Sequence, residues 1–467
     1  MKGDFFEKGS LMEKCRYIAL TDVNSSRFPW VEKDDIQSLI RLFLYSNEID
    51  IEGIVLCSSC FLKHGGGKGA KKIVDRILNA YGQVKRNLDC HADGYPPVGE
   101  LRERVFCGIP AFGKAFNNGF GEEKYKNNPG VQCIVKALES QDSRPLWIGL
   151  WGGANTLAQA LWQLSETKGR EEMKEILKKL RIYSISDQDY SSKWIRANFG
   201  EDLFYIVTPS DGGFEGRKEY YRAVWPGISA DENGHGSEDG IHGGGFQGAN
   251  SSLVLNDWIR ENIQSKGPLG KLYPKTVYIM EGDTPAFLGL IQNGLNVPEH
   301  PELGGWHGRY QKSRDEQNVP IWSGAYDSVL GIDGKVHQSP QASLWRWRED
   351  FQYDFASRME WTVADSFDKG SHPPVVILNG PSVYKIKKGE SVILDVSSSY
   401  SPDGFSLSFH WFFYPESENA VLVKNGRSCV SVSFLSCGIY HLVLKLTGSR
   451  SFPLSRYLRI TFEVEEE

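Results

Sequence analysis

The sequence lacks any apolar run that approaches the roughly 20 residues needed for a membrane span. It also lacks a long basic block, and its 59 acidic and 53 basic residues nearly cancel to a net charge of −6. Electrostatic capture of a nucleic acid polymer or an anionic membrane is therefore not expected. The opening stretch MKGDFFEKGSLMEKCR lacks the apolar centre of a secretory leader, which favours a cytoplasmic location.

Cysteine is scarce and scattered. The eight cysteines have neither the density of a disulfide scaffold nor the paired spacing of zinc ligands. Cys57-Ser-Ser-Cys60 is a single CxxC without a second pair, so we expect inert structural thiols there. A disulfide between Cys429 and Cys437 is the less favoured alternative to two free thiols. Aromatic residues, by contrast, make up 12% of the chain, and such rings either fill cores or stack on sugars.

A chain of 467 residues is too long for one ordinary domain and suits two. We expect an α/β domain over residues 1–372 and a β domain over residues 373–467, divided at His372-Pro373-Pro374. After this boundary, β-branched and aromatic runs alternate with turns such as Ser401-Pro-Asp-Gly404. About seven short strands in so short a region indicate an immunoglobulin-like sandwich.

The N-terminal part begins with a strand–helix–strand pattern. Residues 17–20 are apolar, Asp34 and Asp35 precede an amphipathic pattern over residues 36–44, and residues 51–57 are apolar again. This order predicts a parallel sheet. Further strands are expected at residues 146–151, 182–185, 203–207 and 277–280, with helices following the first and last of these.

Two other segments have a distinct character. Residues 225–250 are rich in Gly, Asp and His without periodicity, and are too long for an ordinary connector. Such a length favours a functional loop or lid. Residues 344–361 carry several Trp and Phe residues and predict a helix buried against the sheet.

Carboxylates follow several predicted strands, where ligands of open parallel sheets bind. The acids are Asp22 after the first strand, Asp34 and Asp35 at the next helix, Asp187 and Asp189 after residues 182–185, and Glu281 and Asp283 after residues 277–280. Such crowding is costly unless a cation or shared protons offset it. Oxygen ligands without a His/Cys cluster favour Ca²⁺. We therefore expect a Ca²⁺ site formed by Asp22, Asp35, Asp283 and a carbonyl near Asn155; in the alternative, each acid merely caps a helix or turn.

Several segments together resemble the nucleoside hydrolases. IALTDV followed by KDDIQSLIRLFLYSNEIDIEGIV resembles the opening of that family, IGLWGGANTLAQAL its Gly-Pro-Leu-Thr-Asn segment, and EGDTPAFL its late His-Asp-Pro segment. The chain is more similar still to nucleoside hydrolase-like proteins with a C-terminal β domain, some described as cellulose-binding. That similarity lies in SISDQD, EGDTPAFLGLI, GGWHGRY and LWRWREDFQYDFASRMEW and covers most of the chain. It implies an open, mostly parallel sheet with helices on both faces, plus the all-β immunoglobulin-like sandwich.

The resemblance also implies roles for individual residues. Asp22 matches a metal-binding acid that acts as general base, and Asp34 the acid that holds the vicinal hydroxyls of the sugar. Asp35 and Asp283 match metal carboxylates, and Asn155 stands where the family supplies a backbone carbonyl to calcium. Leu20 and Gly282 depart from the family, since they occupy the places of an acid and, in some members, of a histidine.

The leading hypothesis is a Ca²⁺-dependent hydrolase of N- or O-glycosidic bonds, in which an activated water attacks the anomeric carbon. Four side chains are candidates for protonating the leaving group: Glu281, His235, His242 and His307. We place Glu281 and His242 among the catalytic candidates, and Asp34, Asp187, Trp306 and His307 among the substrate-binding ones. Core packing is an equally favoured role for Trp306.

The alternative is a carbohydrate-binding protein, of cellulose-like ligands, with a vestigial hydrolase site. The four retained aspartates favour an active site, whereas Leu20 and Gly282 favour the alternative. In a third hypothesis the β domain is a scaffold or forms a homodimer. The partner expected in either main hypothesis is a small sugar-containing molecule, a nucleoside or an oligosaccharide. The accessory β domain favours export, so the compartment stays open.

Overall fold

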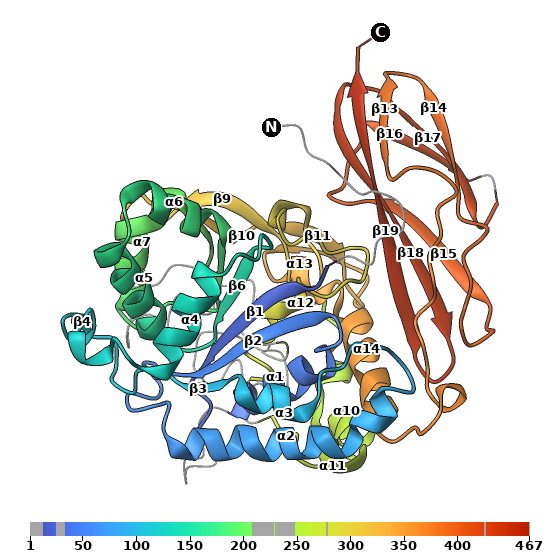
Figure 1. The fold of residues 1–467 in the computed structure, drawn as a ribbon. Coiled ribbons are helices and arrows are strands. Elements are labelled where there is room, and N and C mark those ends of the chain that lie inside the picture. The colour runs from blue at the N-terminus through green and yellow to red at the C-terminus, as the bar shows by residue number, and fades with distance from the viewer. Residues whose placement is uncertain are drawn as a thin grey trace.

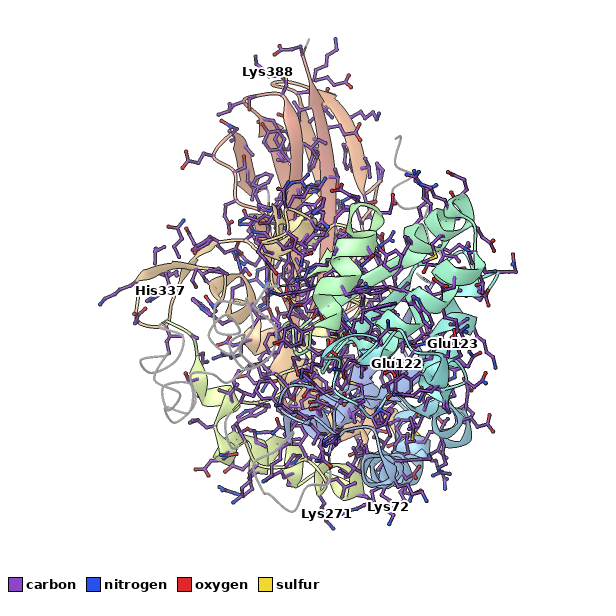
Figure 2. All side chains as sticks on the ribbon, turned by 90° about the vertical axis from the view of Figure 1, so that its left-hand side faces the viewer. Lys72, Glu122, Glu123, Lys271, His337 and Lys388 are labelled. Atoms are coloured by element: carbon purple, nitrogen blue, oxygen red, sulfur yellow. The ribbon has the colours of Figure 1, made fainter. Side chains whose placement is uncertain are left out.

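The computed structural model describes residues 13–24, 33–207, 228, 248–276, 279–424 and 426–466. They form an α/β domain, with an all-β sandwich standing beside it in orange and red (Figure 1). Charged side chains such as Lys72, Lys271 and Lys388 project from the periphery (Figure 2). Among the described helices, none is both long and apolar enough to cross a membrane.

An eight-stranded sheet forms the centre of the α/β domain. Each neighbouring pair of strands is parallel except β10 and β9. This confirms the expected open, mostly parallel sheet. In spatial order the strands are β3 (Val105–Cys107), β2 (Ile49–Leu56), β1 (Cys15–Thr21), β6 (Leu146–Leu150), β7 (Leu180–Ser184), β8 (Phe204–Ile206), β10 (Pro320–Gly324) and β9 (Tyr310–Arg314).

Helices cover both faces of this sheet because its central strands are apolar on both sides. Along β1, Tyr17 and Ala19 belong to one core, and Ile18 and Leu20 to the other. The first core includes residues of α1 (Lys33–Leu44), α2 (Lys68–Leu88), α3 (Val98–Glu103), α10 (Asn256–Ile259), α11 (Gly267–Gly270), α12 (Pro285–Leu288), α13 (Ala342–Trp345) and α14 (Arg348–Trp361). The second includes residues of α4 (Pro129–Glu139), α5 (Asn155–Thr167), α6 (Arg170–Lys179) and α7 (Ser191–Phe199).

The strand expected at residues 277–280 is not found in the part of that segment that the structure describes. Residues 277 and 278 lie outside the described residues, and Ile279 and Met280 are not in a strand. The Met280 carbonyl instead accepts a hydrogen bond of 2.9 Å from the Ile228 N–H. The sheet is extended by β10, which pairs with β8 and turns back through β9. Two short pairs, β4 (Ala115–Phe116) with β5 (Gly119–Phe120) and β11 (Asp327–Leu330) with β12 (Val336–Ser339), lie outside it.

The sandwich contains the expected seven strands among the described residues. One sheet has the order β13 (Val383–Lys387), β19 (Pro453–Glu465), β18 (Gly438–Ser449), β15 (Leu407–Phe413), and the other β14 (Ser391–Asp395), β17 (Cys429–Phe434), β16 (Ala420–Lys424). Alternate residues such as Val430, Val432 and Phe434 face a separate core between the sheets. Cys429 and Cys437 are free, so the favoured expectation of two thiols is confirmed.

Helix α14 joins the two domains. It is the buried helix expected within residues 344–361, and it packs against β19 (Figure 1). Asp350 forms an ion pair of 2.6 Å with Lys445 and accepts a hydrogen bond of 3.0 Å from the Ser455 hydroxyl. Asp354 pairs with Arg456 at 2.7 Å. These buried polar contacts explain why α14 lacks a clear apolar stripe: its polar residues have partners in the other domain.

Candidate functional site

The strand order reverses between β1 and β6. From β1 the chain proceeds outward through β2 to β3 on one side, and through β6, β7 and β8 on the other. In open α/β sheets this switch point leaves a crevice at the carboxyl ends of the strands, where ligands bind. Asp22 directly follows β1 and Gly152 follows β6, so both stand at this crevice. The sheet topology therefore predicts a ligand site at the same edge of the sheet where the acid Asp22 lies.

Asp22 is buried against a glycine turn. A side chain at Gly152 would place its Cβ 2.8 Å from Asp22 Oδ1 and 3.0 Å from Asp22 Cβ, so only glycine permits this approach. The Ser59 hydroxyl donates a hydrogen bond to Asp22 Oδ2. Burial raises the pKa of Asp22 to about 7, although the hydrogen bond from Ser59 opposes the shift. A carboxyl with such a pKa can exchange a proton near neutral pH.

Asp34 and Asp35 begin helix α1, and Asp283 approaches them from a distant segment. One carboxylate oxygen of each lies within 4.8 Å of the other two. The backbone N–H of Gly282 donates to the Asp34 carboxylate, and the Thr21 hydroxyl donates to Asp35 Oδ1. The first turn of a helix favours negative charge, which explains how α1 can present two adjacent acids.

Burial and crowding raise the pKa values of the acids in the cluster. Burial raises the pKa of Asp34 to about 6. Burial, followed by the charges of Asp22 and Asp34, raises the pKa of Asp35 well above its ordinary value. No positively charged side chain is among the groups that set these pKa values in the described part of the chain. Crowded carboxylates, which offer only oxygen donors, fit a hard divalent cation such as Ca²⁺.

The turn that carries Asp283 is held by a buried ion pair. Glu281 has a φ of 52°, a left-handed conformation that is unusual outside glycine. Its carboxylate accepts hydrogen bonds from Arg41 Nη2 at 3.0 Å and from the Thr284 hydroxyl at 2.7 Å, and Tyr273 is a further donor. These contacts hold the strained residue in place. The expectation that Glu281 protonates a leaving group is therefore corrected, because both of its oxygens are committed to structural partners.

Asn155 begins helix α5 beside the glycine turn. Its side-chain amide donates to the Ala111 carbonyl at 2.6 Å, and its backbone N–H donates to Asp189 Oδ2 at 3.2 Å. Asp189 also accepts from the Ser191 N–H, so this carboxylate binds backbone N–H groups at the starts of α5 and α7. The role of the Asn155 carbonyl as a metal ligand stays a prediction.

Asp187 is not available to a substrate. It forms a bidentate pair with Arg196 at 2.8 and 2.7 Å, and Arg196 also binds Asp315 at 2.7 Å. All three side chains are fully buried. The expected substrate-binding role is corrected, because the carboxylate neutralises a buried guanidinium.

Trp306 and His307 lie in the core. Trp306 has 0% exposure, and its indole nitrogen lies 3.5 Å from the Tyr457 hydroxyl of the sandwich. The His307 ring stacks on Tyr310, with centroids 5.6 Å apart, and burial lowers the pKa of His307 to about 4. Neither ring has a face open to a sugar, so both substrate-binding expectations are corrected in favour of core packing.

His235 and His242 lie outside the described residues, together with most of the expected loop at residues 225–250. Their roles stay predictions. Sequence reasoning missed Thr21, Ser59 and Arg41, which contact the acids or their supporting turn. Thr21 immediately follows an apolar run and Ser59 comes two residues after one, and this position was the available signal. Arg41 gave none, because a helical arginine normally faces solvent.

The fold and the site define a nucleoside hydrolase-like α/β domain joined to a β sandwich. Two family models match the chain: "Cellulose-binding Sde182, nucleoside hydrolase-like domain" over residues 16–310, and "Cellulose-binding protein Sde0182, C-terminal domain" over residues 391–464. The first match spans more than half of the chain. The protein therefore belongs to the Sde182 nucleoside hydrolase-like family.

Among solved structures, the chain is similar to a nucleoside hydrolase-related hypothetical protein from Saccharophagus degradans that is associated with carbohydrate metabolism. The two are 28% identical with a TM-score of 0.77, over 97% of this chain and 100% of the other. A PKD domain solved in solution matches at 19% identity, over 19% of this chain and 88% of its own, with a TM-score of 0.16, which is too low to support any argument. No curated protein matches the chain.

Proposed function

We propose that this protein is a Ca²⁺-dependent hydrolase of glycosidic bonds. The observation that carries the proposal is the convergence of Asp34, Asp35 and Asp283 within 4.8 Å, beside Asp22, at the switch point of the sheet. Membership of a nucleoside hydrolase-like family supports hydrolysis, and its cellulose-binding description supports a sugar-type ligand.

Asp22, Asp35 and Asp283 would hold the ion, together with the predicted carbonyl of Asn155. When bound, Ca²⁺ would supply positive charge that orients ring hydroxyls and favours ionisation of a nearby water. Asp22 takes the proton from the attacking water as the general base. Asp34 accepts hydrogen bonds from vicinal hydroxyls of the sugar, and the Gly282 N–H keeps its carboxylate in place. His242 remains the predicted leaving-group acid.

A hydrolysis screen tests this proposal. Nucleosides and aryl glycosides of pentoses and hexoses are incubated with the protein in Ca²⁺ and, separately, in EDTA. We expect turnover of at least one substrate, its loss in EDTA, and its loss in Asp22→Asn. Glu175→Gln, which removes only an exposed ion pair with Lys178, serves as the control and should retain turnover. Turnover that survives both EDTA and Asp22→Asn would contradict the proposal.

The second candidate function is carbohydrate binding with a vestigial site. Leu20 favours it, because this residue replaces a family acid and is fully buried in the core, where it contributes no ligand. In this case sugars bind without turnover, and Asp22→Ala leaves their affinity unchanged. A cytoplasmic location and a homodimer stay predictions.

A further inference from the structure

The Ser59 hydroxyl can act only as a donor towards Asp22. Its oxygen accepts two backbone hydrogen bonds of 3.0 Å, from the N–H groups of Phe61 and Leu62. A hydroxyl has two acceptor lone pairs and one proton. Because both lone pairs are engaged, the remaining proton is given to Asp22 Oδ2. The bond therefore favours the ionised carboxylate and fixes which of its oxygens faces Ser59.

The Thr21 hydroxyl likewise donates a hydrogen bond to the carboxylate of Asp35. Its oxygen accepts a hydrogen bond of 3.1 Å from the Val23 N–H, and its proton is directed to Asp35 Oδ1. Thr21 is fully buried, so no water competes for the hydroxyl. Asp35 of the cluster and the neighbouring Asp22 each accept a hydrogen bond from a hydroxyl that itself accepts from the backbone.

The sheet fixes both hydroxyls relative to one another. Thr21 is the last residue of β1, and Ser59 closely follows the neighbouring strand β2. The Cys57 N–H donates to the Thr21 carbonyl at 2.8 Å, which continues the pairing of β1 and β2 to this edge. The donors therefore stand on rigid backbone, as a preorganised site requires.

We propose that Thr21 and Ser59 are positioning residues that set the affinity of the acid cluster for Ca²⁺. Each hydroxyl occupies one oxygen of its aspartate and leaves the second for the ion. This inference rests on the proposed function, since it concerns the same site. Outer-shell partners of metal ligands typically change metal affinity by roughly 10- to 100-fold, which is the effect expected here.

The test is Ca²⁺ titration by calorimetry on the full chain. Thr21→Val keeps the shape but removes the donor, and Thr21→Ser keeps the donor. We expect Thr21→Val and Ser59→Ala to bind Ca²⁺ roughly 10- to 100-fold more weakly, and Thr21→Ser to bind like the wild type.

Ser455→Ala is the matched control. Ser455 is a buried serine that donates to a carboxylate, Asp350, at the domain contact. Its variant should lose stability without losing Ca²⁺ affinity. If the wild type binds no Ca²⁺, the proposed function fails; if the wild type binds and both Thr21→Val and Ser59→Ala bind equally well, only this inference fails. Should Thr21→Val not fold, Ser59→Ala and the Thr21→Ser comparison decide the question.

Discussion

Arg41 holds Glu281 in a fully buried ion pair between helix α1 and the turn before α12. Neither side chain is exposed, and the contact joins residues far apart in the chain. The same helix carries Asp34 and Asp35 at its start, and the same turn carries Asp283 two residues after Glu281. The ion pair therefore fixes the two segments whose carboxylates form the cluster.

Breaking this pair should destabilise the whole α/β domain. Glu281→Gln leaves the Arg41 charge buried without a partner, and we expect a loss of about 3–5 kcal/mol in the free energy of unfolding, measured in urea. The exposed pair Glu175–Lys178 is the control, and Glu175→Gln should cause no measurable change. Equal effects of the two substitutions would show that the buried pair has no special role.

Gly152→Ala should abolish or strongly weaken Ca²⁺ binding. The added Cβ would stand 2.8 Å from Asp22 Oδ1 and 3.0 Å from Asp22 Cγ, so the carboxylate must move. Gly99→Ala is the matched control because no atom lies within 4 Å of its new Cβ, and its helical position favours alanine by about 1 kcal/mol. Calorimetry of both variants checks the prediction. Unchanged affinity in Gly152→Ala would exclude Asp22 from the ion site.

Asp35→Asn should stabilise the metal-free protein at pH 8. Burial and the neighbouring acids raise the pKa of Asp35 in the folded protein above its value in the unfolded chain. The folded state therefore loses stability as the pH rises above the unfolded pKa, because the buried carboxyl resists ionisation. The amide removes that cost, and the gain should vanish near pH 4, where the carboxyl is already protonated. Asp187→Asn should have the opposite sign, since Asp187 neutralises Arg196. Thermal unfolding in EDTA measures both. Destabilisation by Asp35→Asn at pH 8 would argue against carboxylate crowding.

The domain contact should weaken in strong acid. Burial alone would raise the pKa of Asp354, but Arg456 and Arg358 reverse the shift and lower it to about 2. A lowered carboxyl pKa contributes stability that is complete above the unfolded value of about 3.8 and is lost as pH falls through 2. The stability difference between wild type and Asp354→Asn, measured in urea, should shrink by about 2 kcal/mol between pH 5 and pH 2. A difference that does not change with pH would contradict this.

Several central strands of the sheet were predictable because their signals are local. Residues 17–20, 51–57 and 146–151 are buried on both faces, so apolar runs alone identify them. The acids after the first strand were predictable for the same reason. Within the strand expected at residues 277–280, the described residues Ile279 and Met280 are not in a strand, because an apolar run can also be buried in a loop, as Met280 is.

For several residues the predicted role in the site was wrong, because the partners that bind them are distant in the sequence. Nothing near Asp187 shows that Arg196 and Asp315 will surround it, and nothing near Glu281 identifies Arg41. Long-range ion pairs of this kind leave no periodic pattern. The local sequence GGWHGRY likewise could not reveal that Trp306 packs against the sandwich.

Crystals of the protein grown or soaked in Ca²⁺ show directly whether these carboxylates bind an ion. We expect an ion with oxygen ligands at about 2.3–2.6 Å, drawn from Asp35 and Asp283 together with Asp22. In crystals of Asp35→Asn the density should disappear under the same conditions. An empty cluster in the wild type, or an ion bound elsewhere while these carboxylates have no ligand, would rule out the Ca²⁺ site.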